Sequence, residues 1–357
     1  MSPVRAASPL RQTSSPKLAA LPGSGTGASA RTSDEMFTVG ALPPFGPARW
    51  KFLDDPNNWR PERRQLHDKL IDDSVKKASV FAEAIERSGR EPTLFALRGN
   101  TASGKTRMAN SAVPVLADAI KQSEGGCINP DLFKVRLGKV PGQPELTSSE
   151  VHAESCVLAD RLERELADCR TESGKPASML VDKRLGGAHE VASYIKLAEE
   201  TGRKIELCDI DAPLQSSLLG VLQRPPGGDD PRPPYAAVSA GFSAIRSNRL
   251  DVIDKFLAKP QLGTYHLYGT SATGAKIPVA TVATGELTIH DPEKYAEIMN
   301  PANSSPGDIG DQRIDDETIE QLTQGMPASL KENARDALQE YRGMSWSEAL
   351  QAHSTLK

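Results

Sequence analysis

Four short apolar runs alternate with longer amphipathic stretches between residues 93 and 222. The runs cover residues 93–98, 126–129, 178–182 and 204–209, and each has the length and composition of a buried strand. The stretches that follow place apolar side chains at helical spacing: Met108, Ala112, Leu116 and Ile120; Val151, Ser155, Leu158, Leu162 and Leu166; and Leu214, Leu218, Val221 and Leu222. Strands that alternate with helices in this way predict an α/β fold, a parallel sheet with helices on both faces.

The N-terminal segments have a different character. Residues 1–45 are rich in Ser, Pro, Ala and Gly, with no acidic residue before Asp34, so they bury too little apolar surface to order themselves. They are expected to form a disordered tail, either a plain flexible tail or an unstructured signal of the kind that type III secretion systems read. Residues 46–90 space apolar side chains for helices on a core: Leu66, Leu70, Val75, Val80 and Ala84.

The C-terminal part combines a loop, a hairpin and helices. Residues 225–234 hold too many prolines and glycines for regular structure. Residues 263–289 alternate in the manner of a β-hairpin, with a turn at Thr273-Gly274. Residues 312–357 have a helical, amphipathic pattern whose expected apolar contacts are Ile319, Leu322, Leu330, Ala334, Leu338 and Tyr341.

Composition narrows the class of protein. The chain of 357 residues has 47 acidic and 43 basic side chains, a net charge of −4, whereas domains that bind nucleic-acid backbones are usually basic. Nucleic acid is therefore disfavoured as a partner. No apolar run approaches the ~18 residues that span a bilayer, so we expect a soluble protein with no membrane partner. The four cysteines lack paired C-x-x-C spacing, which suits a reducing compartment.

The first apolar run ends in a complete phosphate-binding motif. Residues 99–106 match the P-loop pattern G-x-x-x-x-G-K-[ST], in the order Gly99, Asn100, Thr101, Ala102, Ser103, Gly104, Lys105 and Thr106. The two glycines let successive backbone N–H groups point at phosphate oxygens. Lys105 is expected to reach the β- and γ-phosphates, and the Thr106 hydroxyl to ligate Mg²⁺. The motif predicts binding of ATP or GTP with Mg²⁺.

A P-loop alone does not distinguish a kinase from a mechanical ATPase or a GTPase switch. The chain has no apolar strand that ends in Asp-Glu and no Asn-Lys-x-Asp motif, which disfavours helicases, transporter ATPases and GTPases. A kinase that acts on a small substrate remains. Such an enzyme needs a phosphate cradle, a carboxylate base near the acceptor hydroxyl, and arginines over the γ-phosphate.

Carboxylates follow the predicted strands, at the edge of the sheet where α/β folds bind ligands. Asp131 is placed to accept the proton of an acceptor hydroxyl, with a helix N-cap as its alternative role. Asp182 is a candidate for holding the water shell of Mg²⁺ or for the base itself. Asp211, which precedes Ala-Pro, is expected to cap a helix.

Two arginines and a helix start complete the candidate set. Arg224 and Arg232 are expected to close over the transferred phosphoryl group, because a guanidinium matches phosphate oxygens; solvated surface arginines are the alternative. Thr147 and Glu150 have the spacing of a capping box. Glu150 and His152 are weaker candidates for contacts with hydroxyls of the substrate.

The order of these features resembles a zeta-toxin kinase domain over roughly residues 91–260. The likeness rests on the P-loop, Asn-Pro-Asp-Leu-Phe-Lys, Ser-Glu-Val-His, Leu-Val-Asp, and Ala-Pro-x-x-x-Ser-Leu-x-Gly-Val-x-x-Arg followed by a second Arg. The resemblance implies transfer of a phosphoryl group from ATP or GTP to a sugar 3′-hydroxyl. It also implies site roles: Asp131 as base, Lys105 and Thr106 as contacts to nucleotide and Mg²⁺, and Arg224 and Arg232 as phosphate ligands.

The tail and the C-terminal elements go beyond a minimal zeta toxin. The whole chain is similar to a branch of type III effectors of plant-pathogenic bacteria, which phosphorylates NAD on the 3′-hydroxyl of its adenosine ribose. The resemblance therefore implies NAD as first-choice acceptor, with UDP-N-acetylglucosamine as the alternative. It further implies a toxin or secreted effector that resides in the bacterial cytoplasm before export and binds a small antitoxin- or chaperone-like protein.

We therefore predict four regions: a disordered tail at 1–45, a helical segment at 46–90, a P-loop kinase domain at 91–260, and a hairpin and helical extension at 261–357. Two other functions stay open. One is a polynucleotide kinase, and the other is a nucleotide-binding virulence scaffold without transfer activity.

Overall fold

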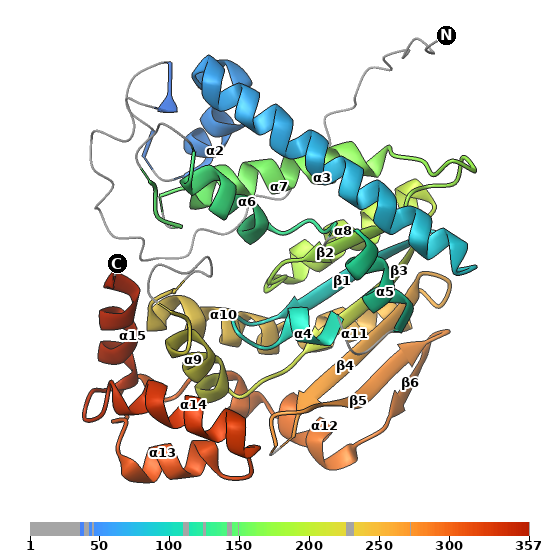
Figure 1. Ribbon diagram of the computed structural model, residues 1–357. Coiled ribbons are helices and arrows are strands. Elements are labelled where there is room, and N and C mark those ends of the chain that lie inside the picture. The colour runs from blue at the N-terminus through green and yellow to red at the C-terminus, as the bar shows by residue number, and fades with distance from the viewer. Residues whose placement is uncertain are drawn as a thin grey trace.

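A six-stranded sheet organises the molecule (Figure 1). The computed structural model describes residues 36–38, 43–44, 46–109, 114–123, 126–140, 145–148, 150–225, 232–271 and 273–356, and most of the predicted tail lies outside these ranges. The strands are β1 (Thr93–Gly99), β2 (Met179–Asp182), β3 (Lys204–Ile210), β4 (Gly263–Thr270), β5 (Lys276–Ala283) and β6 (Glu286–Ile289). Their order across the sheet is β2-β1-β3-β4-β5-β6.

The first four strands run parallel, and β5 and β6 are antiparallel to their neighbours. β1 pairs with β2 and with β3, and the pairs Leu97–Asp182 and Gly99–Ile210 align the carboxyl ends of these three strands. In open α/β sheets ligands bind at this edge. The P-loop begins there, at the last residue of β1.

Helices precede, follow and connect the strands. They are α2 (Pro47–Asp54), α3 (Pro61–Arg87), α4 (Lys105–Ala109), α5 (Pro114–Gln122), α6 (Pro130–Gly138), α7 (His152–Ala167), α8 (Ala188–Thr201), α9 (Leu214–Leu222), α10 (Tyr235–Ser247), α11 (Arg249–Leu257), α12 (Pro292–Met299), α13 (Asp316–Thr323), α14 (Ala328–Gln339) and α15 (Trp346–Thr355). Short 3-10 helices cover Pro56–Asn58, Pro301–Ser304 and Ile309–Asp311. Among the described residues, none of the helices is long and apolar enough to cross a bilayer.

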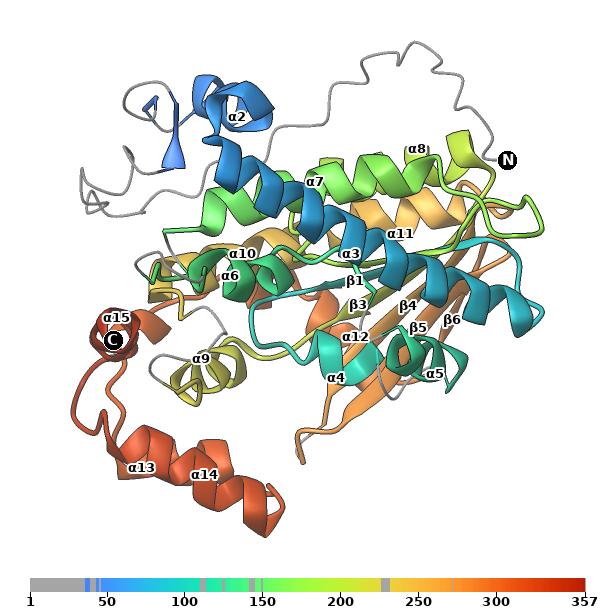
Figure 2. The ribbon, with the colours of Figure 1, turned by 45° about the horizontal axis from the view of Figure 1, so that its top comes forward.

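Side chains of the strands alternate between two helical layers. In β1, Leu94 and Ala96 join a core cluster with α7, α8 and α11, whereas Phe95 and Leu97 join a cluster with α4 and α5. Figure 2 shows these two sets of helices on opposite sides of the sheet. The long helix α3 contributes to both clusters. The predicted fold class, a P-loop α/β sheet with helices on both faces, is confirmed.

The C-terminal helices form a further core with the helices that follow β3. In this core α14 and α15 pack on α9 and α10 through side chains that include Leu218, Leu338 and Trp346, all fully buried. Most of the apolar contacts predicted for this part are buried or partly buried. Leu330 is the exception, because its side chain is 41% exposed.

Several sequence-based expectations need correction. Residues 126–129 do not form a strand, since Ile128 makes a single parallel bridge to Val181. Val80, expected in the core, is 43% exposed. The predicted hairpin exists as β4 and β5, but β4 pairs in parallel with β3. The hairpin therefore extends the main sheet across the boundary predicted at residue 260.

Asp211 does not cap the helix that follows it, contrary to the prediction. The N-cap residue of α9 is Pro213, which makes no side-chain cap. The Asp211 carboxylate instead accepts hydrogen bonds from Arg246 at 2.6 Å and from Arg249 at 2.8 Å. It is thus part of a buried ion-pair network behind the P-loop.

Candidate active site

The P-loop joins β1 to α4 in a conformation that requires both of its glycines. Gly104 has a φ of +88°, which residues with a side chain rarely adopt. At Gly99, a β-carbon would lie 2.6 Å from Ser103 Oγ and 2.9 Å from the Ile210 carbonyl oxygen. Gly104 thus supplies a left-handed turn, and Gly99 allows the loop to approach β3 closely.

The loop is held between the sheet and the pair α9 and α10. A β-carbon on Gly220 of α9 would lie 2.8 Å from the Ala102 β-carbon, so the helix backbone touches the tip of the loop. The Asn100 side-chain amide donates to the Val238 carbonyl of α10 at 3.1 Å. These contacts hold the loop against both helices.

Lys105 lies in the middle of a group of charges. Its Nζ donates to the carbonyls of Gly99 and Asn100 at 3.0 and 2.9 Å. Burial lowers the pKa of the ammonium. Four charged side chains also act on it: Asp182 and Asp131, which raise its pKa, and Arg184 and Arg224, which lower it. The predicted nucleotide lysine, the predicted base and one predicted arginine are therefore close together.

Asp182 ends β2 beside the P-loop threonine. Its carboxylate accepts from the Thr106 hydroxyl and the Asn129 amide, both at 3.3 Å, and the residue is 8% exposed. Burial raises the pKa of Asp182, an effect that Lys105 and the two hydrogen bonds offset only in part. A P-loop hydroxyl beside a strand-end aspartate is the pair that holds Mg²⁺ in P-loop enzymes. These residues fit the ion, because a divalent cation would offset the cost of burying the carboxylate.

Asp131 lies in the first turn of α6 and is oriented by a buried lysine. One carboxylate oxygen lies 2.6 Å from Lys134 Nζ, and the Lys134 side chain is 3% exposed against 45% for Asp131. The N-cap of α6 is Asn129, whose side-chain oxygen accepts from the Asp131 backbone N–H at 2.9 Å. The capping role weighed for Asp131 therefore belongs to Asn129, and the Asp131 carboxylate faces outward.

His152 and Glu150 lie at the start of α7. His152 is an exposed residue, and partial desolvation of its imidazole, with the charges of Lys134 and Arg184, lowers its pKa to about 4. Its imidazole is therefore neutral at pH 7. Thr147 and Glu150 exchange the hydrogen bonds of a capping box, from the Thr147 N–H to Glu150 Oε2 at 2.7 Å and from the Glu150 N–H to the Thr147 hydroxyl at 3.3 Å. They do so ahead of the helix, however, because α7 begins at His152 and its N-cap is Val151, which makes no side-chain cap.

Arg184 is a site residue that the sequence pattern did not single out. Its guanidinium donates to the Thr101 hydroxyl of the P-loop at 3.2 Å and to the Ala237 carbonyl at 3.4 Å. Burial lowers its pKa, while Glu190 and Asp131 act in the opposite direction. Its position two residues after the strand-end Asp182 is the signal that could have identified it, because that loop leaves the ligand-binding edge of the sheet.

The two predicted phosphate arginines occupy different places. Arg224 follows α9, and its charge acts on Lys105. Arg232 donates to the carbonyl of His353 at 2.9 Å and to that of Leu356, both at the end of the chain. Arg224 therefore lies near Lys105, whereas the Arg232 side chain contacts the end of the C-terminal helix α15. Residues 226–231 between them lie outside the described ranges.

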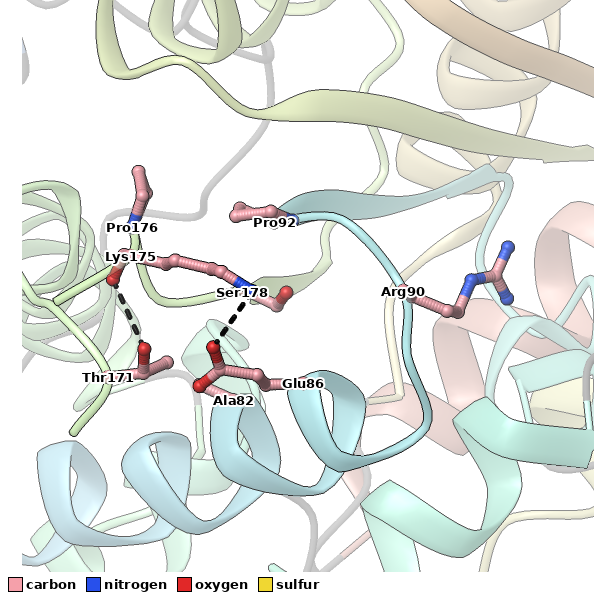
Figure 3. A pocket seen from close by; sticks show the side chains of 8 residues that line it. All are labelled: Ala82, Glu86, Arg90, Pro92, Thr171, Lys175, Pro176 and Ser178. Carbon is pink, nitrogen blue, oxygen red and sulfur yellow. Dashed lines mark hydrogen bonds and ion pairs between the residues drawn. The ribbon is translucent and has the colours of Figure 1, made fainter. Parts of the chain in front are cut away.

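The cavity drawn in Figure 3 lies at the other edge of the sheet. Pro92 and Ser178, which line it, directly precede β1 and β2, so it belongs to the amino ends of the parallel strands. Its volume of about 10 Å³ suffices for roughly one water molecule. This cavity is too small to hold a nucleotide.

Several known proteins are similar to this chain in sequence and fold. The zeta toxin family model matches residues 78–232, a range that contains the P-loop and the carboxylates described above. No curated protein matches the chain significantly. Solved structures of the AvrRxo1-ORF1 complex with AvrRxo1-ORF2 are similar to it along nearly its whole length.

In the complex with sulphate ions, the similar chain is 52% identical with a TM-score of 0.85, over 90% of this chain and 98% of that one. In the native complex the similar chain is 51% identical with a TM-score of 0.86, over 91% of this chain and 98% of that one. In the complex with ATP it is 52% identical with a TM-score of 0.85, over 90% of this chain and 98% of that one. With half of the residues identical and the family model covering the P-loop, this chain belongs to the zeta toxin family of P-loop kinases and is similar to AvrRxo1-ORF1.

Proposed function

We propose that the protein transfers the γ-phosphoryl group of ATP to the 3′-hydroxyl of a ribose or sugar, with NAD as first-choice acceptor. The observation that carries the proposal is the grouping of Lys105, Asp182 and Asp131 beside the P-loop. It combines a phosphate-binding lysine, a metal-binding carboxylate and an accessible carboxylate base, the parts that phosphoryl transfer needs. ATP is preferred to GTP because the similar AvrRxo1-ORF1 complex was determined with ATP.

In this reaction the acceptor hydroxyl attacks the γ-phosphorus, the bond to the β–γ bridging oxygen breaks, and the hydroxyl proton passes to Asp131. Lys134 engages one Asp131 oxygen at 2.6 Å, which leaves the other for the acceptor. Thr106 and Asp182 would hold Mg²⁺, which neutralises charge on the phosphates when bound.

Cationic side chains complete the proposed site. Arg184 and Arg224 lie close enough to Lys105 to lower its pKa, so an anionic phosphate chain beside Lys105 would be stabilised by all three. Arg232 would have to leave the carbonyls of His353 and Leu356 to join them. We retain it as a proposed phosphate ligand of a closed state.

NAD is chosen from the resemblance to the effector branch of the family, whose members phosphorylate its adenosine ribose. UDP-N-acetylglucosamine is the alternative acceptor. Both molecules carry a diphosphate, and Arg184, whose charge acts on both Asp131 and Lys105, is suited to bind it. His152, whose imidazole is neutral, and the side chain of Glu150 are proposed contacts for hydroxyls of the acceptor.

We also propose that the protein acts as a toxin or secreted effector and binds a small antitoxin- or chaperone-like partner before export. The support is that AvrRxo1-ORF1 was crystallised with AvrRxo1-ORF2. Co-purification with the product of a small neighbouring gene tests the idea. A chain that purifies alone when the two are co-expressed would count against it.

One assay separates the candidate functions. The purified protein is incubated with γ-labelled ATP, Mg²⁺ and NAD, UDP-N-acetylglucosamine or a single-stranded oligonucleotide. We expect labelled NAD, with the phosphate on the 3′-hydroxyl of the adenosine ribose. Label on the nucleotide sugar supports the alternative acceptor, label on the oligonucleotide a polynucleotide kinase, and no labelled product a nucleotide-binding scaffold.

The role of the base is tested by Asp131→Asn. The variant should bind ATP within about two-fold of the parent, while the transfer rate falls by roughly 10²–10⁴-fold, the usual contribution of a general base. The matched control is Asp68→Asn, since the Asp68 side chain is 54% exposed and pairs with Arg161 away from the P-loop group. Full activity of Asp131→Asn would remove Asp131 from the mechanism.

A further inference from the structure

Lys276 extends from the first residue of β5 over the end of the P-loop. A β-carbon built on Gly104 would lie 3.1 Å from Lys276 Cε and 3.8 Å from its Nζ. The lysine side chain therefore packs directly on the P-loop backbone at Gly104. It comes from the C-terminal hairpin, so no local sequence motif connects it with the nucleotide site.

The Lys276 ammonium uses one of its three N–H donors within the protein. Its Nζ donates to the Thr270 hydroxyl at 2.5 Å, and that hydroxyl donates in turn to the Asp211 carbonyl at 2.8 Å. In the part of the chain that the structure describes, Lys276 forms no ion pair with a carboxylate. An ammonium has three N–H donors, so two remain for a ligand.

The electrostatic surroundings favour an anion at this point. Burial lowers the pKa of Lys276 to about 8, while Asp211 raises it and Arg107 lowers it further. A half-buried lysine without a carboxylate partner is held in its charged form when an anion binds beside it. The P-loop on which it packs is itself a binding site for phosphate oxygens.

We propose that Lys276 is a second nucleotide lysine, which contacts the α- and β-phosphates of ATP from the side of the hairpin. The inference rests on the proposed function. Lys105 donates to carbonyls at the start of the loop, Gly99 and Asn100, and P-loop lysines reach the β- and γ-phosphates. Lys276 lies against Gly104, toward the other end of the loop, and the backbone N–H groups of a P-loop receive the α- and β-phosphates.

The test compares nucleotide affinities of Lys276 and Lys105 variants by titration calorimetry with ATP and with ADP. Lys276→Met should weaken both nucleotides by the same factor, about ten-fold or more, since both carry the α- and β-phosphates. Lys276→Arg should restore affinity to within about three-fold because it keeps the charge. Lys105→Met should weaken ATP more than ADP, because its partner phosphates include the γ-phosphate.

Two controls separate a nucleotide contact from a structural role. Lys259→Met removes an exposed lysine, 40% exposed and paired with Glu199, and should leave both affinities unchanged. The KM for NAD should change less than two-fold in Lys276→Met, whereas general damage to the fold would affect both substrates. Should Lys276→Met fail to fold, Lys276→Gln, which keeps a polar end without the charge, is measured in its place.

The outcomes distinguish the inference from the proposed function. A folded Lys276→Met protein that binds ATP and ADP as tightly as the parent overturns the role of Lys276. If the parent protein binds no ATP, or binds it and labels no acceptor, the proposed function fails whatever the variants do. Parent activity on NAD together with unchanged affinities in Lys276→Met removes only the Lys276 contact.

Discussion

Asp209 and Asp182 lie near the carboxyl ends of the two strands that flank β1, and both are buried, yet their surroundings differ. Asp209 has a full set of partners. Arg98 donates to it, Arg249 donates at 3.1 and 3.2 Å, and the Tyr265 hydroxyl donates at 2.9 Å. Burial alone would raise the pKa of Asp209, but the charges of Arg249 and Arg98 outweigh it and the pKa is lowered.

Asp182 is buried with weaker partners. It accepts 3.3 Å hydrogen bonds from the neutral side chains of Thr106 and Asn129, and burial raises its pKa despite the nearby Lys105. This difference in partners gives the two buried carboxylates different roles. Asp209 is already neutralised by arginines and stabilises the fold behind the P-loop, whereas Asp182 gains a matching partner only when a cation binds.

The largest effect on stability is expected when Asp209, the carboxylate paired with arginines, is replaced. Asp209→Asn leaves Arg98 and Arg249 buried with less opposing charge and should lower the free energy of unfolding by about 3–5 kcal/mol. Urea unfolding of the variant measures this. Asp68→Asn, the same substitution in an exposed ion pair with Arg161, should cost about 1 kcal/mol or less. Equal losses in the two variants would show that the arginine network contributes little.

Asp182→Asn should have the opposite profile, with activity lost and stability kept. We expect the Mg²⁺-dependent transfer rate to fall by about 100-fold or more, because metal coordination contributes several kcal/mol to the transition state. The free energy of unfolding without Mg²⁺ should stay the same or rise, since the substitution removes a carboxylate whose burial is unfavourable. A large loss of stability with normal activity would reverse the roles assigned to the two aspartates.

The smallest expected effect is on how the free energy of unfolding changes with pH, to which Asp182 and Asp209 contribute with opposite signs. The pKa of Asp182 is raised in the folded protein, so the folded state binds the proton more tightly than the unfolded state. Above the ordinary carboxyl pKa of 3.8, Asp182 therefore makes the protein less stable as pH rises, until the folded pKa is passed. The slope is at most about 1.4 kcal/mol per pH unit for one proton.

Asp209 acts with the opposite sign, because its folded pKa is lowered. Its contribution is complete above pH 3.8 and is lost as pH falls below that value toward the folded pKa. Unfolding free energies measured from pH 3 to 7 for the parent and for Asp182→Asn test the comparison. Asp182→Asn should gain most relative to the parent at the upper end of this range. A difference that is constant with pH would mean that Asp182 titrates normally.

The sequence predicted much of the kinase core, because its signals are local. The P-loop needs two glycines, a lysine and a threonine at fixed spacing, and the apolar runs that became β1, β2 and β3 are continuous in the chain. The run at 126–129 failed as a strand for a tertiary reason. β2 is a short edge strand, and only Ile128 comes close enough to bridge to Val181.

Assignments that depend on partners distant in sequence were the ones that failed. Asp211 has the local pattern of a helix cap, but Arg246 and Arg249 bind its carboxylate. Arg184 follows the strand-end Asp182 without a motif of its own, and its contact with the Thr101 hydroxyl assigns it to the P-loop. Leu330 fits an amphipathic pattern, yet the C-terminal helices turn it toward solvent.

By itself, the sequence determined that this protein carries a phosphate-binding loop on a parallel α/β sheet. Both features are set by residues that are close together in the chain: the loop by its glycines Gly99 and Gly104, and the sheet by the alternation of strands and helices. Only the tertiary structure decided which charges surround that loop. Lys276 reaches Gly104 from a hairpin beyond the predicted kinase domain, and Asp209 and Asp182 differ through arginines supplied by other segments. Electrostatic roles depend on distances in space, and folding brings together side chains that no spacing along the chain relates.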